Sequence, residues 1–293
     1  MAVGAFNESL WQVTDLFTTL DGGQEPDFPN AEKVARSSLE AAANGLDLFT
    51  SLGINPEALD YPTPHSLHVS NLALSIGLEL GYDEKLLVNL STGCLLHDVG
   101  MLRVDDKVWQ REKQLQPAEF APIANHPCHS VALLSSYLES VPFATRMVVY
   151  QTHERLDGSG YPRGCSSEHI HQLAKVAAVA DAFVALVSDR PHRESMMPYH
   201  AMAKLLADVQ SGYYDGKVVR ALLSTVSLFP LGSYVLLSDG RIARVLRANG
   251  DKYTQPVVEA WTVNQYDVAG DVIDLSQTDA LKITQPLSTL PAS

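Results

Sequence analysis

Residues 152–162 read T-H-E-R-L-D-G-S-G-Y-P, and this stretch indicates the fold because related elements lie on both sides of it. Upstream, residues 95–100 read L-L-H-D-V-G, and His65 opens an earlier segment of helical character. Downstream, residues 179–183 read V-A-D-A-F within an apolar run. Histidines and aspartates that recur on separate helical segments are typical of a metal site in the core of a helical bundle.

The order of these motifs resembles the HD-GYP family, a branch of the HD-domain metal-dependent phosphohydrolases. Between residues 64 and 193 the chain carries, in order, H-S-x-x-V, L-L-H-D-x-G, H-P, H-E-R-x-D-G-S-G-Y-P, V-A-D-x-F and S-D-R-P-x-R. One isolated H-D pair would be a weak signal, whereas this ordered set is specific. The resemblance implies an all-helical domain with a two- or three-metal centre, often of iron, and hydrolysis of the bacterial messenger cyclic di-GMP.

The composition limits the class of protein. A chain of 293 residues, 46% of them apolar, is long enough for one large domain and a smaller one. The net charge of −13 argues against a protein that coats nucleic-acid polymers and against binding to anionic membrane surfaces. The three cysteines show no C-x-x-C spacing, and there is no signal peptide or long apolar run, so we expect a cytoplasmic protein with reduced thiols.

The predicted fold class is mainly α, an HD-domain helical bundle with an N-terminal helical extension and a small C-terminal β-barrel-like module of SH3 type. We place the extension at residues 1–61, the helical metal-binding domain at 62–230, the β module at 231–284 and a flexible tail at 285–293. Apolar periodicity predicts helices at 31–51, 64–80, 83–97, 143–153, 175–188, 199–210 and 217–227, and one more that starts at Pro127.

Particular residues mark the ends of these elements. We expect Asn30 and Thr63 to be N-caps, with Pro64 in the first helical position and His126 at the N-cap before Pro127. In the β module, Asp239-Gly240 separates two strand-like segments, which predicts a hairpin over 234–246, and further strands are expected at 256–263 and 272–275.

The resemblance assigns six metal ligands. Among them, Asp98 would bridge two cations. His97 and Asp98 would be the catalytic residues, beside a hydroxide that bridges the two metals. Imidazole and carboxylate suit iron, which the family favours, and equally manganese or zinc. Gly100 provides the distorted helix end that lets two adjacent side chains reach one site. The alternative is that each is a separate structural residue. The six residues are His65, His97, Asp98, His126, His153 and Asp181.

The resemblance also assigns the substrate-binding residues. Gly160, Tyr161 and Pro162 would form a rigid loop against the nucleotide, although an ordinary Gly-Pro turn is the alternative. Glu154, Arg155 and Asp157 are expected to hold this loop by salt bridges. Arg190 and Arg193 would face substrate phosphates, with surface arginines as the alternative, and Lys175 keeps a basic position that a structural ion pair would explain equally well.

Four positions depart from the family pattern. Met101 stands where a lysine usually follows the H-D-x-G motif, and Thr152 replaces the first of two adjacent histidines. Tyr61 stands where three-metal members carry a glutamate, which predicts two metals and no third, and Val184 removes a second carboxylate. The ligand set is thus largely kept while the groups that handle substrate are fewer.

Two functions fit this combination. The first is a metal-dependent cyclic dinucleotide phosphodiesterase, whose activity is weak for lack of the lysine. The second is a catalytically weak or inactive relative that binds a nucleotide or protein partners through the Gly-Tyr-Pro loop or the β module. Hydrolysis of mononucleotides is a third option that would not need this loop, and a homodimer is left open.

Overall fold

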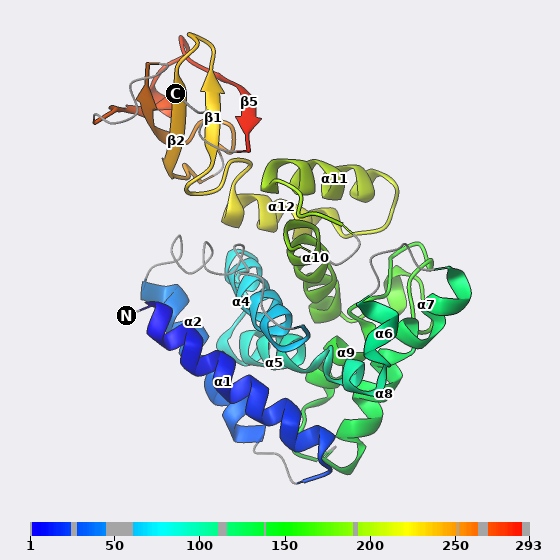
Figure 1. Cartoon of the computed structure of the whole chain (residues 1–293). Coiled ribbons are helices and arrows are strands. Elements are labelled where there is room, and N and C mark those ends of the chain that lie inside the picture. Colours follow the sequence, from blue (N-terminus) through cyan, green and yellow to red (C-terminus); the bar gives the residue numbers. More distant parts are fainter. Residues whose placement is uncertain are drawn as a thin grey trace.

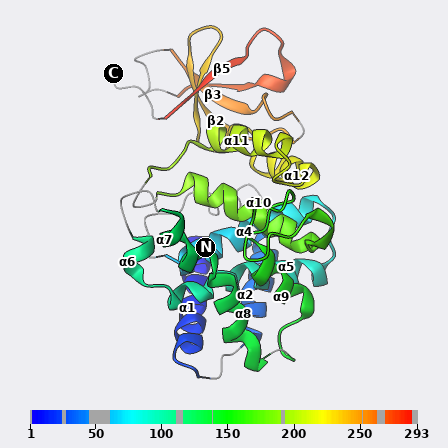
Figure 2. The same cartoon turned by 90° about the vertical axis from the view of Figure 1, so that its right-hand side faces the viewer.

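The computed structural model describes residues 2–24, 28–44, 61–110, 116–137, 139–189, 193–250, 252–262 and 269–288. It is mainly helical, with a small antiparallel sheet near the C-terminus, so the predicted mainly α class is confirmed. Figures 1 and 2 show the sheet at one end of a helical body. Among the described residues, no helix combines the length and the apolarity that crossing a bilayer requires.

Two helices precede the central body. α1 (Ala2–Asp21) and α2 (Phe28–Asn44) bury one apolar face each against it, and Phe17 shares a core cluster with Leu96. The predicted cap at Asn30 is wrong, because α2 already begins at Phe28, whose ring packs 5.2 Å from that of Tyr137. The contact between Phe28 and Tyr137 favours a helix that begins at Phe28, before the position that Asn30 suggests. The predicted end of this helix lies outside the described residues.

The central body is built from α4 (Thr63–Glu79), α5 (Glu84–Leu96), α9 (Phe143–Gln151) and α10 (Gln172–Val187). Leu72, Leu90, Val148 and Phe183, one from each helix, belong to the same buried cluster. As predicted, α10 is buried over most of its length. The Asp83 side chain caps α5 by accepting a hydrogen bond from the Leu86 amide at 2.8 Å.

Two predicted caps are wrong by one residue. α4 begins at Thr63 itself, because Pro62 already has a near-helical backbone, so Pro64 takes the second helical position. α8 (His126–Leu134) begins at His126, because Asn125 also ends α7 (Pro117–Ala124) and passes the chain directly from one helix to the next. His126 is therefore inside the first turn of α8.

Short helices connect the central elements and were not predicted. They are η1 (Val99–Arg103), α6 (Asp106–Trp109), α7, η2 (Ser135–Tyr137) and η3 (Ser167–His169). A capping box starts α7, in which the Gln116 amide donates to the Glu119 carboxylate at 2.9 Å. Beyond α10, the chain continues through α11 (Pro198–Gln210) and α12 (Gly216–Val226), close to the predicted bounds.

The C-terminal sheet has five antiparallel strands in the order β4-β3-β2-β1-β5. The strands are β1 (Tyr234–Leu237), β2 (Ile242–Arg247), β3 (Val257–Trp261), β4 (Asp271–Asp274) and β5 (Ile283–Leu287). The predicted hairpin is present, and Gly240 has the positive φ of +86° that its turn requires. In the described part of the chain β4 and β5 remain edge strands, so the sheet is open and the barrel-like, SH3-type closure is not confirmed.

β5 extends past residue 284, where the sequence placed the end of the β module. Pro286 argues against a strand at this point of the sequence, because a proline has no backbone N–H to donate. It is tolerated in β5 because an edge strand pairs on one side only, and the other side needs no donor. The sheet packs on the helices through Phe229 and Tyr199, whose rings stack 5.5 Å apart. It therefore lies beyond α11 and α12, away from the body formed by α4, α5 and α9 (Figure 1).

Candidate metal centre

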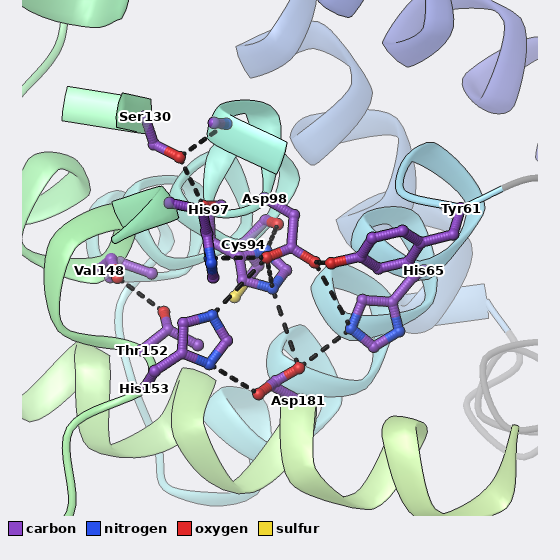
Figure 3. A network of polar contacts seen from close by, with 12 residues as sticks. Tyr61, His65, Cys94, His97, Asp98, Ser130, Val148, Thr152, His153 and Asp181 are labelled. Carbon is purple, nitrogen blue, oxygen red and sulfur yellow. Dashed lines mark hydrogen bonds and ion pairs between the residues drawn. The ribbon is translucent and has the colours of Figure 1, made fainter. Parts of the chain in front are cut away.

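The six predicted ligands converge in the core, and all of their side chains are buried. Figure 3 labels five of them around one point. Most come from helix ends, where the backbone turns and adjacent side chains can face the same site. They are His65 in the first turn of α4, His97 and Asp98 directly after α5, His126 at the start of α8, His153 just after α9 and Asp181 in the middle of α10.

Gly100 and Ser130 fix the end of α5 against α8. A side chain at Gly100 would put its Cβ 2.2 Å from the carbonyl oxygen of His126, so only glycine permits this approach. The Gly100 amide donates to Ser130 Oγ at 2.8 Å, and this hydroxyl donates to the His97 carbonyl at 2.8 Å. The distorted helix end expected at Gly100 is confirmed, and it brings His126 beside His97.

Asp98 is the hub of the cluster. Its Oδ1 lies 3.1 Å from His126 Nε2, 3.3 Å from His97 Nε2 and 3.6 Å from His153 Nε2. Its Oδ2 lies 3.9 Å from His65 Nε2. Two groups of three ligand atoms form around it, one from His65, His97 and Asp98 and one from Asp98, His126 and His153. Because Asp98 belongs to both groups, its carboxylate is placed to be shared between two cations.

Asp181 closes the cluster on the α10 side. Its Oδ1 lies 3.0 Å from His65 Nε2 and 3.9 Å from His97 Nε2, and its Oδ2 lies 3.3 Å from His153 Nδ1. The two aspartates thus contact histidines from both groups, which joins the six residues into one continuous set.

Backbone contacts fix the tautomer of two histidines. His97 Nδ1 lies 2.7 Å from the Cys94 carbonyl oxygen, and His126 Nδ1 lies 2.7 Å from that of Ile123. A carbonyl only accepts, so each Nδ1 carries the proton and each Nε2 presents a lone pair when the ring is neutral. This is the second hydrogen bond that a metal-binding histidine makes to orient its ring.

Four buried atoms at the centre of the cluster have no hydrogen-bond partner within the described ranges. They are His97 Nε2, Asp98 Oδ1, His126 Nε2 and His153 Nε2. Leaving a polar atom buried without a partner costs about 1–3 kcal/mol each. Lone pairs from imidazole and carboxylate facing one another are unfavourable unless a proton or a metal cation lies between them. The residues present therefore fit divalent metal ions.

The charges of the cluster offset one another in part. Burial opposes ionisation of Asp98 and Asp181, but the neighbouring histidines hold the pKa of both carboxyls well below the usual range. Burial also lowers the pKa of His153, but Asp181 and Asp98 outweigh it and raise that pKa to about 9. At neutral pH the metal-free cluster therefore holds two carboxylates beside at least one imidazolium, and a divalent cation would replace that proton.

Tyr61 contacts the cluster, and no such contact was predicted for it. Its hydroxyl donates to Asp98 Oδ2 at 2.8 Å, and its ring centroid lies 5.7 Å from that of His65. The available signal was its position, four residues before His65, where three-metal members of the family carry a glutamate. The substitution was predicted to remove a ligand, and in addition it introduces a hydrogen-bond donor.

The family profile described as "HD domain" matches residues 41–218, which is more than half of the chain and contains all six residues of the cluster. The order of the motifs and the curated relatives of the chain place it in the HD-GYP branch. The chain belongs to the HD-GYP family.

Curated relatives of this HD-GYP chain carry names of cyclic dinucleotide phosphodiesterases. It is 28% identical over 279 residues to cyclic di-GMP phosphodiesterase PA4108 of Pseudomonas aeruginosa, covering 94% of this chain and 67% of that protein. It is 25% identical over 223 residues to cyclic di-GMP phosphodiesterase PdeB of Borreliella burgdorferi, covering 76% and 57%. It is 32% identical over 157 residues to 3′3′-cGAMP-specific phosphodiesterase 1 of Vibrio cholerae, covering 53% and 35%. The chain thus spans about one third to two thirds of these relatives.

Among solved structures, the HD-GYP chain is similar to Bd1817, an HDG"Y"P protein from Bdellovibrio bacteriovorus. The TM-score is 0.62 at 19% identity, and the match covers 74% of this chain and 69% of that one. At this identity the likeness shows a shared fold.

The Gly-Tyr-Pro loop of this HD-GYP chain is held by backbone hydrogen bonds. The buried Glu154 carboxylate accepts from the Arg163 amide at 2.8 Å and from the Cys165 amide at 3.0 Å. The Asp157 side chain accepts from the Ser159 amide at 3.0 Å. The expectation that salt bridges hold this loop is therefore corrected, because these carboxylates bind N–H groups of the turn instead.

The glycines of the loop have the predicted tasks. Gly158 has a φ of +85°, and a Cβ on Gly160 would lie 2.3 Å from the Arg155 amide nitrogen. This close approach turns Tyr161 toward the cluster, where its ring stacks on His153 with centroids 4.9 Å apart and planes inclined by 16°. The loop thus supports a candidate metal ligand directly.

The departures at Thr152, Met101 and Val184 are all buried. Thr152 Oγ1 donates to the Val148 carbonyl of its own helix at 2.6 Å, which commits its hydroxyl to the backbone. Met101 lies on η1, and Val184 packs in the core cluster around α10. None of the three adds a charged group to the site.

Of the predicted basic substrate contacts, Arg193 donates to the carbonyls of Leu186 at 3.1 Å and Ala185 at 2.6 Å at the end of α10. Lys175 donates to Ser167 Oγ at 3.3 Å. The alternative to a substrate contact was a structural ion pair, and this contact is a hydrogen bond to a neutral hydroxyl. Arg190 lies outside the described residues. These contacts give Arg193 and Lys175 structural tasks, and their role in binding substrate stays a prediction.

Proposed function

We propose that this HD-GYP chain is a metal-dependent phosphodiesterase that hydrolyses a cyclic dinucleotide, cyclic di-GMP in the first instance. The observation that supports it most is the arrangement around Asp98 Oδ1, where three imidazole nitrogens approach within 3.6 Å without a hydrogen bond to it. Such an arrangement suits a divalent cation in its middle. The names of the relatives supply the reaction and the substrate class.

The cluster would hold two divalent metals that share Asp98. One would be bound by His65, His97 and Asp98 and the other by Asp98, His126 and His153, with Asp181 beside both. Iron is favoured by the family, and manganese or zinc suit the same ligands. Two such ions would supply Lewis acidity, which makes water nucleophilic at neutral pH and offsets charge that develops on the phosphate.

The chain itself orients this chemistry. His97 and His126 are held by backbone carbonyls, His153 is held by the stacked Tyr161, and Asp98 lies between them. Burial, then Asp181 and Asp98, raise the pKa of Tyr161, so its phenol stays neutral and can donate a hydrogen bond to a nucleotide. Gly160 and Pro162 would fix the position of that phenol. A role for Arg190, Arg193 and Lys175 toward phosphates belongs to the same proposal.

A second function is favoured by Met101. This buried thioether stands where the family supplies a lysine, so the site lacks one cation that would bind the scissile phosphate. Losing one preorganised group of this kind costs about 10²–10³ in turnover. The chain would then be a weak enzyme or a nucleotide-binding module that signals through the Gly-Tyr-Pro loop or the sheet. A homodimer and a cytoplasmic location remain predictions.

Metal content measured on protein purified without chelators or metal-affinity columns tests the proposal, with Asp98→Ala as the control. We expect about two metals per chain, lost in the variant, followed by release of linear dinucleotide or GMP from cyclic di-GMP under reducing conditions. Folded wild-type protein without metal contradicts the hydrolase. Two metals and tight cyclic di-GMP binding without turnover favour the nucleotide-binding module.

A further inference from the structure

Tyr61 makes a polar contact with the hub of the cluster that the ligand set does not require. It lies two residues before α4, and its hydroxyl donates to Asp98 Oδ2 at 2.8 Å. Figure 3 shows Tyr61 on one side of Asp98 and His153 on the other. A hydrogen bond to a buried carboxylate of this length is strong, because the acceptor is charged.

The ring of Tyr61 is itself held in place. Its centroid lies 5.7 Å from that of His65 on α4 and 5.1 Å from that of Trp109 on α6. Two elements far apart in the sequence therefore fix the phenol before it meets Asp98. A ring in contact with two other rings has few positions available for its hydroxyl.

The two oxygens of Asp98 consequently have different surroundings. Oδ1 faces the three imidazole nitrogens, whereas Oδ2 accepts from Tyr61 and faces His65. The terminal torsion of an aspartate has broad minima, so its own preferences do not fix the plane of the carboxylate. A donor at one oxygen does fix it.

We propose that Tyr61 is a positioning residue for the metal centre, which fixes the plane of the Asp98 carboxylate so that Oδ1 faces the His97, His126 and His153 nitrogens and Oδ2 faces His65. This inference rests on the metal centre of the proposed function. Tyr61 acts through Asp98, to which its hydroxyl donates, and stays outside the ligand set.

Tyr61→Phe tests this, because it removes the hydroxyl and keeps the ring in contact with the rings of His65 and Trp109. Metal affinity is measured by competition with a chromophoric chelator, and kcat and KM for cyclic di-GMP are measured at saturating metal. We expect affinity to fall about 10–100-fold, the usual effect of losing a group that orients a metal ligand. We expect kcat to fall at saturating metal while KM stays within about threefold, because the phenol contacts Asp98 and not the substrate.

Tyr234→Phe in β1 is the matched control and should leave metal affinity unchanged. Trp109→Phe is the second variant. This variant weakens the ring contact that supports Tyr61 but leaves the Tyr61 hydroxyl in place. We therefore expect metal affinity to fall less than in Tyr61→Phe. Equal metal affinity of wild type and Tyr61→Phe overturns the inference while leaving the phosphodiesterase intact, whereas a wild type that binds no metal overturns both.

The visible spectrum of the oxidised iron form separates positioning from ligation. A phenolate bound to ferric iron gives an intense charge-transfer band, and a phenol that donates to Asp98 gives none. We expect no such band in wild type. A band that Tyr61→Phe abolishes would make Tyr61 a ligand and overturn its assignment as a positioning residue.

Discussion

The Tyr161 ring stacks on the His153 ring with centroids 4.9 Å apart and planes inclined by 16°. This contact connects the Gly-Tyr-Pro loop to the metal cluster, because His153 lies 3.6 Å from Asp98 Oδ1 and 3.3 Å from Asp181 Oδ2. The loop therefore supports the cluster, in addition to the contact with substrate that we propose for it. Disturbing Tyr161 should affect metal binding and substrate binding together.

We predict that Tyr161→Ala lowers metal affinity and reduces kcat/KM for cyclic di-GMP by more than about tenfold. Truncation removes the stacked pair, worth about 0.5–1.5 kcal/mol beyond its buried area, and lets the His153 ring rotate. Tyr161→Phe keeps the ring and is the matched control. It should keep metal affinity within about threefold of wild type, so any further loss of kcat/KM in it measures the hydroxyl alone. Unchanged metal affinity in Tyr161→Ala would contradict this role of the loop.

Metal binding should strengthen as the pH rises. The pKa of His153 is raised to about 9 in the metal-free protein, because Asp181 and Asp98 outweigh the effect of burial. Metal binds the neutral imidazole, so below pH 9 each binding event releases this proton, and affinity gains about tenfold per pH unit. Above pH 9 the proton is already gone and this gain ends.

Calorimetry in buffers of different ionisation enthalpy measures that proton release between pH 7 and 9. His200→Ala, an exposed position on α11, is the control and should keep the wild-type slope. A metal affinity that stays constant from pH 7 to 8.5 would be inconsistent with a protonated His153.

Met101→Lys should raise the turnover of cyclic di-GMP. Met101 follows Gly100 on η1 and is buried, so a lysine there would bring a cation near the end of α5. We expect kcat to rise about 10–100-fold, within the range that one preorganised charged group contributes. The same change should lower the free energy of unfolding of the metal-free protein by about 1–3 kcal/mol, because it buries an ammonium group.

Met101→Leu separates the charge from the change in shape. Its kcat should equal that of wild type, since it adds no donor. If kcat of Met101→Lys does not exceed kcat of Met101→Leu, the missing lysine does not explain a weak activity. Other groups that bind the substrate would then differ from those of the family.

The convergence of the six candidate ligands could be predicted from the sequence, because each lies in a short motif and the order of these motifs is specific. His97 and Asp98 are followed by Gly100, and that glycine carries the information that the helix ends there and that α8 approaches closely. Local sequence therefore encodes both the ligands and the bend that presents them. The central helix α10 was predictable for a similar reason, since its apolar residues continue around its circumference.

The contacts of Tyr61, Arg193 and Glu154 could not be predicted in the same way. The Tyr61 hydrogen bond depends on α4 and the end of α5 lying side by side, which is a property of packing and not of spacing. Arg193 was expected to face phosphates, but it donates to carbonyls that the last turn of α10 leaves without helical partners. Glu154 was expected in a salt bridge, and the nearest donors proved to be amides of the turn that follows it.

Gly160→Ala should disrupt the loop while sparing the helices. The added Cβ would lie 2.3 Å from the Arg155 amide nitrogen and 2.5 Å from Glu154 backbone atoms, and backbone cannot move aside as a flexible side chain can. We expect a loss of about 1–3 kcal/mol in the free energy of unfolding, typical of overpacking. Because this displacement moves Tyr161 off His153, kcat/KM for cyclic di-GMP should fall by more than about tenfold. Gly216→Ala is the matched control, since its Cβ would meet only the Val209 side chain, at 3.3 Å. It should retain wild-type activity, and a Gly160→Ala variant equally active would mean that the close backbone approach does not position Tyr161.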